Sequence, residues 1–254
     1  MVAQSTLFIA GSIALLAGAT YGHVALQLAR RPGLSGDSRS AIRLFALWWG
    51  ALGANLVVVA LASFAATFGT LTFGWQMADS ILQRGLLSLS LVGLMGYMFY
   101  VLTGHTRLLL LSIVYATYFV FLMGSLVAQQ PTGVTILAWR TDLEYAREPA
   151  VWVQPVNLAL TIMPPVVSSI AYLRLLSRVV DRSKRYRIAV VSSSLLVWWT
   201  IAVVAGQPGL IDSEVVQLTG RALSLCSALA VLAAFRPPLW VQRRYGIQDY
   251  ASAA

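Results

Sequence analysis

The stretch RLLSRVVDRSKRYR at residues 174–187 lies between two apolar segments and holds six of the 18 Lys and Arg residues of the chain. Eight more basic residues fall in three other gaps between apolar segments, and they are Arg30, Arg31, Arg39, Arg43, Arg107, Arg236, Arg243 and Arg244. The alternate gaps are mostly acidic, with Asp142, Glu144 and Glu148 in one and Asp212 and Glu214 in another. Short loops rich in Lys and Arg stay in the cytoplasm. The pattern therefore predicts an all-α bundle of seven transmembrane helices with the N-terminus outside and the C-terminus cytoplasmic.

The composition of the chain agrees with a membrane location. Hydrophobic residues make up 58% of the 254 residues, charged residues make up 11%, and the mean hydropathy is +0.75. Soluble domains typically carry about 25% charged residues. The net charge of +9 would suggest nucleic acid as the partner of a soluble protein, but here the basic residues flank helix ends, where anionic headgroups lie. We therefore expect a multi-pass protein of a prokaryotic inner (plasma) membrane, with the lipid bilayer and no nucleic acid as its partner.

The apolar segments define one transmembrane domain that covers residues 1–254. The expected helices span residues 5–29, 41–68, 75–102, 108–128, 151–176, 188–204 and 213–235. The longest outer segment, residues 129–150, is the only one with the chemistry of a soluble protein, and VTILAW at residues 134–139 could form a strand or a lid over the helix ends. The single cysteine, Cys226, lies within the last helix, so no intramolecular disulfide is expected.

Charged residues inside the bilayer are costly and mark the place where function is expected. Asp79, Arg84 and Arg221 are such residues, and all three lie in the outer half of their helices. Arg84 is nine residues past Trp75 and Arg221 is eight past Ser213, so both lie about 12 to 14 Å along their helices. At equal depth the two guanidinium groups are expected to face one another.

Polar residues at helical spacing accompany these charges on three helices. The candidate ligand-binding residues are Gln76, Asp79, Arg84, Gln154, Asn157, Glu214, Gln217 and Arg221. An outer cavity with two arginines would suit a small carboxylate, because Arg presents a planar fork of donors to it. The alternative is a structural network in which Asp79 and Glu214 pair with the two arginines and hold the third and seventh helices together. Pairing explains the residue types equally well, so the sequence leaves both interpretations open.

No signature of catalysis or of a cofactor is found. The sequence has no Cys, His and carboxylate cluster with metal-ligand spacing, no Gly-rich phosphate loop and no nucleophile elbow. We therefore expect no metal, no cofactor and no enzymatic activity. A rhodopsin-type protein would need an amine in the last helix for a retinal Schiff base, but the only lysine, Lys184, lies in a loop. Arg221 cannot replace it, because its guanidinium stays protonated and is not a nucleophile. Covalently bound retinal is therefore excluded.

Two segments of the second half carry a family resemblance. One is DRSKRYR at residues 181–187, which leads into a helix with Trp198 and Trp199, and the other is FRPPLWVQRR at residues 235–244. They resemble the N-terminal seven-helix sensor region of bacterial histidine kinases, in which a similar exit precedes the output module. The phospho-acceptor helix pair and the ATP-binding domain of that family do not follow here. The resemblance thus implies a stand-alone relative that acts through a cytoplasmic or membrane signalling partner.

The expected function is therefore that of a receptor-like or sensory membrane protein that binds a small ligand or a protein partner. The alternatives are a small-solute transporter and an accessory subunit of a membrane complex. A transporter predicts polar residues through the inner half of the bundle and commonly an internal repeat. The sequence shows neither feature, which places transport second.

Overall fold

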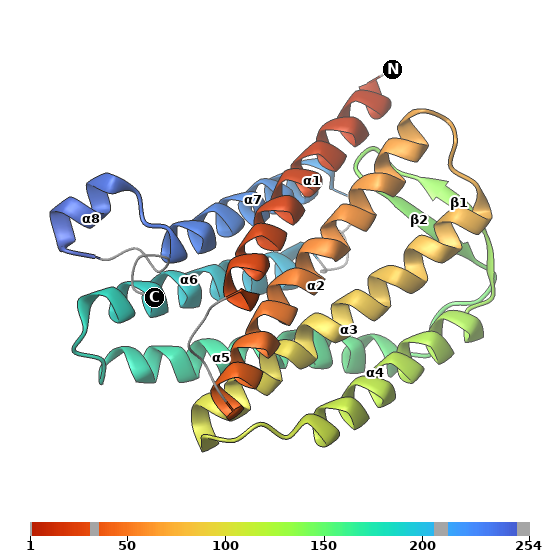
Figure 1. Cartoon of the computed structure of the whole chain (residues 1–254). Coiled ribbons are helices and arrows are strands. Elements are labelled where there is room, and N and C mark those ends of the chain that lie inside the picture. The colour runs from red at the N-terminus through yellow and green to blue at the C-terminus, as the bar shows by residue number, and fades with distance from the viewer. Residues whose placement is uncertain (1, 31–35, 206–212, 248–254) are drawn as a thin grey trace.

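The chain folds into a helical bundle with one small β-hairpin (Figure 1). The computed structural model describes residues 2–30, 36–205 and 213–247, without the side chains at 2, 3, 199, 202 and 205. The elements in chain order are α1 (Val2–Ala29), α2 (Gly36–Thr67), α3 (Phe73–Thr103), α4 (Leu108–Ala128), β1 (Pro131–Ile136), β2 (Thr141–Tyr145), α5 (Val153–Leu176), α6 (Arg182–Ala205), α7 (Glu214–Phe235) and α8 (Leu239–Tyr245).

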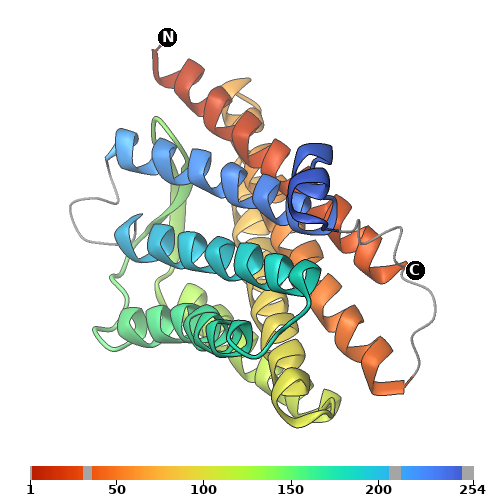
Figure 2. The same ribbon diagram turned by 90° about the vertical axis from the view of Figure 1, so that its left-hand side faces the viewer.

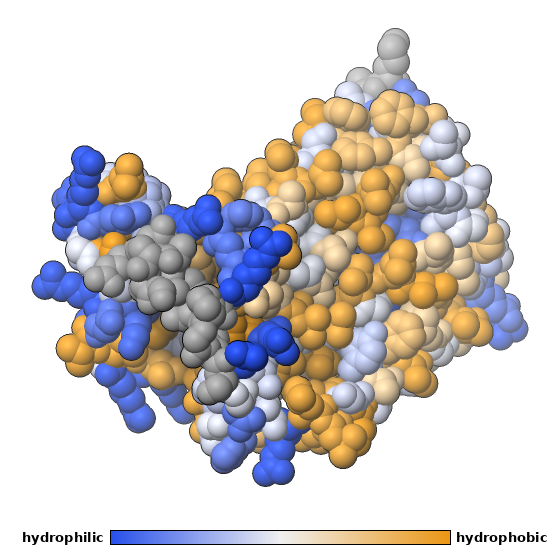
Figure 3. All heavy atoms as spheres, viewed as in Figure 1, coloured by the Kyte–Doolittle hydropathy of each residue, from blue (hydrophilic) through white to orange (hydrophobic). Residues whose placement is uncertain are grey.

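The long helices are suited to a membrane. In the described part of the chain, six helices are long and apolar enough to cross one, namely α1 to α5 and α7. Many large apolar side chains point outward, for example Leu109 and Val120, which are 78% and 67% exposed. Figure 3 shows apolar residues over much of the visible flank, while hydrophilic residues gather at the end that carries α8. The expectation of a mostly helical membrane bundle is confirmed.

The helices form a ring, which the two views of Figures 1 and 2 make clear. α1 packs against α2 and α7, α2 packs against α3, and α5 packs against α3 and α6. The contact between α6 and α7 completes the ring, and α4 packs along the outside of α3. The α1–α7 contact includes a hydrogen bond of 3.1 Å between the Tyr21 hydroxyl and Ser227 Oγ. The first and last long helices are thereby held together.

Small residues allow the backbones of neighbouring helices to approach closely. A Cβ atom at Gly18 would lie 2.7 Å from the carbonyl oxygen of Gly53, and one at Gly93 would lie 2.8 Å from that of Leu44. The α1–α2 and α2–α3 contacts therefore require these glycines, as expected of helix contacts in membranes. The core next to Gly53 is aromatic, with Tyr21 and Trp49 stacked at 5.1 Å between ring centres.

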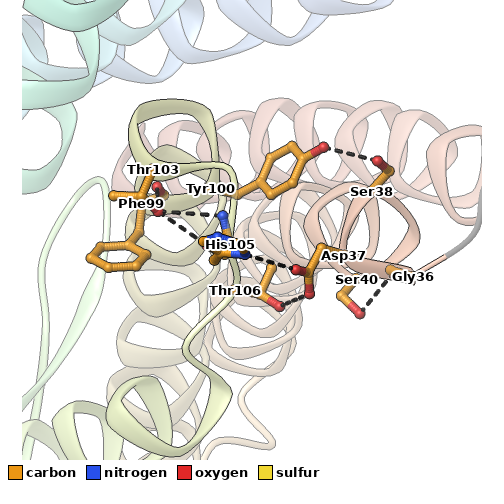
Figure 4. A network of polar contacts seen from close by, with 9 residues as sticks. All are labelled: Gly36, Asp37, Ser38, Ser40, Phe99, Tyr100, Thr103, His105 and Thr106. Carbon is orange, nitrogen blue, oxygen red and sulfur yellow. Dashed lines mark hydrogen bonds and ion pairs between the residues drawn. The ribbon is translucent and has the colours of Figure 1, made fainter.

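A polar network fastens the start of α2 to the α3–α4 turn (Figure 4). Asp37 accepts hydrogen bonds from the Thr106 hydroxyl at 3.0 Å and lies 3.3 Å from Nδ1 of His105. The hydroxyls of Ser38 and Tyr100 lie 2.8 Å apart in the same region. The side chains of Asp37 and His105 are exposed to solvent, and those of Ser38 and Tyr100 are half-buried. It fixes the connection between α3 and α4 at the end of the bundle opposite the hairpin.

The β-hairpin departs from the all-α expectation. β1 and β2 pair antiparallel with Val134 opposite Leu143, so part of the proposed strand at residues 134–139 is present, whereas β2 was not expected. The remainder of that segment forms the turn, closed by a hydrogen bond of 2.8 Å from the Leu137 N–H to the Arg140 carbonyl. Cross-strand pairing gives the backbone N–H and C=O groups of this segment hydrogen-bond partners.

Two helix starts were also wrong by five residues or more. α2 begins at Gly36 rather than 41, and α6 begins at Arg182 rather than 188. The early start of α6 follows from the Asp181 side chain, whose Oδ1 accepts from the N–H groups of Ser183 at 2.8 Å and Lys184 at 3.1 Å. Hydropathy reports only the apolar part of such a helix. The short helix α8 was not expected at all, and it ends at Tyr245, before Gly246, whose φ is 64°.

Candidate functional site

A cavity of about 490 Å³ opens at the end of the bundle where the hairpin lies, which we call the hairpin end. Six helices, α2 to α7, and the hairpin form its walls. α2 and α3 supply much of the lining, α5 and α7 supply one polar residue each, and the hairpin turn covers it. The polar and charged lining residues are Asn55, Ser63, Gln76, Ser80, Gln83, Arg84, Arg140, Thr141, Asp142, Asn157 and Arg221.

Arg84 and Arg221 both line this cavity, from α3 and α7. Arg84 donates from Nη1 to the Ser80 carbonyl at 3.2 Å and from Nη2 to the Tyr145 hydroxyl at 3.5 Å. Arg221 donates from Nη2 to the Trp139 carbonyl at 3.3 Å. These distances lie at or beyond the long end of the usual N–H···O range. Both guanidinium groups are thus held loosely by the hairpin.

The other predicted residues divide into two groups. Gln76 and Asn157 line the cavity, and Asp79 is buried beside it, where its Oδ2 accepts a hydrogen bond from Gln83 Nε2. Gln154, Glu214 and Gln217 do not line it. Gln154 and Glu214 are exposed in the first turns of α5 and α7. Glu214 lies seven residues before Arg221, so the two share nearly the same face of α7, but Glu214 is about 10 Å nearer the start of the helix. Gln154 likewise lies one turn before Asn157 on α5, so both residues are too close to the helix start to reach the cavity.

The expected ion-pair network is not formed among the described residues. Two ion pairs are found there, one joining Arg140 Nη2 to Asp142 Oδ2 at 3.0 Å and the other joining His105 to Asp37. Neither Asp79 nor Glu214 lies within 4.0 Å of Arg84 or Arg221. Asp212, in the same outer gap, lies outside the described residues. The structural interpretation as first stated is therefore wrong for Asp79 and Glu214.

The hairpin turn forms the roof of the cavity, a role that the sequence did not predict. Trp139 is 5% exposed, so the turn is inserted between the helix ends. The Arg140 guanidinium lies over the Trp139 ring at 4.4 Å and is paired with Asp142, and all three residues line the cavity. The only signal in the sequence was the alternation of polar and apolar residues in TDLEY at residues 141–145.

Several polar atoms of the cavity wall lack partners within the described residues. Gln76 is 1% exposed, and its Oε1 accepts no hydrogen bond, while Nε of Arg140 donates none. Such groups are costly when buried without a partner. The lining also carries three arginines against the single carboxylate of Asp142, an excess of two positive charges. The cavity therefore offers donors and positive charge to an acidic group and one acceptor to a neighbouring donor.

Comparisons with known proteins show the fold. No family model matches the chain, and no curated protein matches it in sequence. Among solved structures, the chain is similar to the crystal structure of squid rhodopsin, with a TM-score of 0.56 and 11% sequence identity. The match covers 96% of this chain and 85% of the squid rhodopsin chain. The bundle thus has a rhodopsin-like arrangement of helices, and at this identity the likeness shows the fold alone.

Proposed function

We propose that this protein is a receptor-like membrane protein that binds a small hydroxy- or amino-carboxylate in the cavity at the hairpin end. One observation carries the proposal. Arg84 and Arg221 converge on a single cavity, and no described carboxylate pairs with either of them. A charge inside a membrane bundle is costly, so an unpaired one points by default to a functional site.

The chemistry of the wall selects the ligand class. A carboxylate can accept two parallel hydrogen bonds from one guanidinium and the charge of the second. The buried Gln76 oxygen needs a donor, which a hydroxyl or an ammonium group next to the carboxylate would supply. A volume of about 490 Å³ lies within the range of small-molecule sites, which is roughly 300 to 1,000 Å³.

The proposed topology has seven spans, with α6 as the span additional to the six found in the described part. α6 has 24 residues, which at about 1.5 Å each exceeds the hydrocarbon core of roughly 30 Å. The basic loops then place the hairpin end outside the cytoplasm and the Lys184 loop inside it. The ligand would enter from outside an inner (plasma) membrane. A cytoplasmic or membrane signalling partner, as expected from the resemblance to sensor regions, would respond to the change in the bundle on ligand binding.

A transport function agrees less well with the packing of the bundle interior. On the side of the cavity away from the hairpin, the described core is closed by large buried side chains, among them Phe45, Trp48, Trp49, Leu94 and Met98. A transporter needs a polar path past its binding site toward the other face. The packed aromatic layer supports a bundle that holds a ligand without passing it on.

Binding in lipid nanodiscs tests the proposal. We expect lactate or alanine, added as single compounds, to bind saturably by calorimetry, and lactamide, which lacks the carboxylate, not to bind. Arg84→Ala and Arg221→Ala should each weaken binding about 10- to 150-fold, because a charge-assisted hydrogen bond contributes roughly 1.5 to 3 kcal/mol. Arg147→Ala is the matched control, since it removes an arginine from the same side of the bundle but outside the cavity. Equal binding of lactate and lactamide, or no binding of either carboxylate, would contradict the proposal.

A further inference from the structure

A second cavity lies at the opposite end of the bundle, among the ends of α1, α2, α3, α5, α6 and α7. Its volume is about 280 Å³. The walls are apolar and belong to the main core, with Leu28, Phe45, Val191 and Phe235 all 5% exposed or less. Two cations, Lys184 and Arg187, lie on the first turns of α6 and line the same cavity. It shares no lining residue with the cavity at the hairpin end.

One buried polar group in this cavity has unsatisfied hydrogen-bonding capacity. Tyr172 of α5 is 5% exposed and lines the cavity. Its hydroxyl lies near the Tyr97 side chain but makes no hydrogen bond of normal geometry within the described residues. A buried hydroxyl without a partner costs about 1 to 3 kcal/mol. A ligand that brings an oxygen into the cavity would remove that cost.

The placement of the two cations limits the chemistry of the ligand. Lys184 is exposed and Arg187 is half-buried, so the charges lie at the mouth and the apolar walls lie deeper. A fully polar anion would make no apolar contacts with the walls, and a neutral hydrocarbon would make no ionic contacts with Lys184 and Arg187 at the mouth. An amphipathic anion matches both parts. The small volume suits a single chain or ring rather than a lipid with two chains.

We propose that this cavity binds an amphipathic anion, with its hydrocarbon portion against Phe45 and Phe235 and its acidic group between Lys184 and Arg187. The shared chemistry is a hydrocarbon chain next to a carboxylate or phosphate. It has two sources, a free medium-chain acid and one acyl chain of an anionic membrane lipid. Because the cavity joins the ends of α5, α6 and α7, its occupant would fix the relative positions of these three helices.

The first test uses decanoate as the probe and the full chain in nanodiscs of neutral phosphatidylcholine. We expect saturable binding of decanoate and at least 10-fold weaker binding of decanol, which has the same chain without the charge. The double variant Lys184→Gln with Arg187→Gln should bind decanoate at least 10-fold more weakly. Arg185→Gln is the matched control, because Arg185 belongs to the same basic stretch but does not line the cavity. Size-exclusion chromatography and the unliganded melting temperature verify that each variant is folded.

The second test separates the two sources and locates the site. Nanodiscs of phosphatidylglycerol should compete with decanoate if an anionic lipid occupies the cavity, and they should leave its affinity unchanged if only the free acid fits. A diazirine derivative of decanoate should crosslink to residues of α5, α6 or α7 that line the cavity in either case. Equal binding of decanoate and decanol, equal weakening by Arg185→Gln, or crosslinks confined to the outer lipid-facing surface would overturn the proposal.

Discussion

Replacing Arg221 by alanine should leave the empty bundle almost as stable as the wild type. In the described structure, the contact that Arg221 makes is one hydrogen bond of 3.3 Å to the Trp139 carbonyl. Because this hydrogen bond is long, its loss should cost about 1.5 kcal/mol, the lower end of the range for charged donors. The loss is opposed by the removal of a poorly solvated cation, which is also repelled by the charge of Arg140.

The net change in the free energy of unfolding should therefore stay within about 1 kcal/mol. For a chain of this size that corresponds to a shift in melting temperature of roughly 2 to 4 °C. Removing one partner of a buried ion pair would instead cost about 3 to 5 kcal/mol. The corresponding fall in melting temperature would be roughly 6 to 20 °C. The two cases are far enough apart for an ordinary thermal melt to separate them.

The assay is a thermal melt of the wild type, Arg221→Ala and the control Arg147→Ala in one detergent without added ligand. A fall of more than about 6 °C for Arg221→Ala alone would refute the reasoning, because it would reveal a paired carboxylate. Asp212→Asn identifies the partner in that event. An equal fall in melting temperature for Arg221→Ala and Asp212→Asn would assign the pair to Asp212 and Arg221.

Three further predictions follow from topology, helix capping and the last helix. A single cysteine at position 184 in a Cys226→Ser background should resist a membrane-impermeant reagent in intact cells, whereas one at position 138 in the hairpin turn should react; the reverse result would invert the topology. Hydrogen bonds from the backbone N–H groups of Lys184 and Ser183 lower the pKa of Asp181 below its ordinary value of 3.8. The cap should therefore stabilise the start of α6 above that pH and be lost as the pH falls through the lowered pKa, and hydrogen exchange at residues 183–185 should show this in the wild type but not in Asp181→Ala. Added retinal should give no borohydride-reducible adduct, and an adduct mapped to α7 would disprove the argument from its lysine-free sequence.

Depth within the bundle was predictable from the sequence, because a helix advances a fixed distance per residue. Counting from the helix ends placed Arg84 and Arg221 in one layer, and both line one cavity. A shared helix face was a less reliable guide. Glu214 begins α7 seven residues before Arg221, on nearly the same face but about 10 Å nearer the helix end, and it does not line the cavity. Gln154, in the first turn of α5, lies three residues before Asn157 and does not line the cavity either.

The hairpin shows what periodicity along the chain cannot supply. Residues 131–145 are too short and too mixed in polarity to be recognised as a membrane element. Their structure depends on pairing across the turn and on the burial of Trp139 and Leu143 against distant helices. Those contacts join residues far apart in the sequence, so neither local pattern nor spacing reports them. α8 was missed for a related reason, since its seven residues hold too few turns for a period to be visible.

The hydrogen bonds between the hairpin and the two arginines should also depend on whether a ligand is bound in the cavity. In the described structure, Tyr145 and Trp139 supply acceptors for Arg84 and Arg221, at 3.5 and 3.3 Å. A neutral hydroxyl and a backbone carbonyl are weaker acceptors for a guanidinium than a carboxylate. Under the proposed function, a bound carboxylate would take over these donors and release two contacts between hairpin and helices. Ligand binding and the seating of the hairpin would then be linked equilibria, so any change that loosens the hairpin contacts must also change the apparent affinity for the ligand.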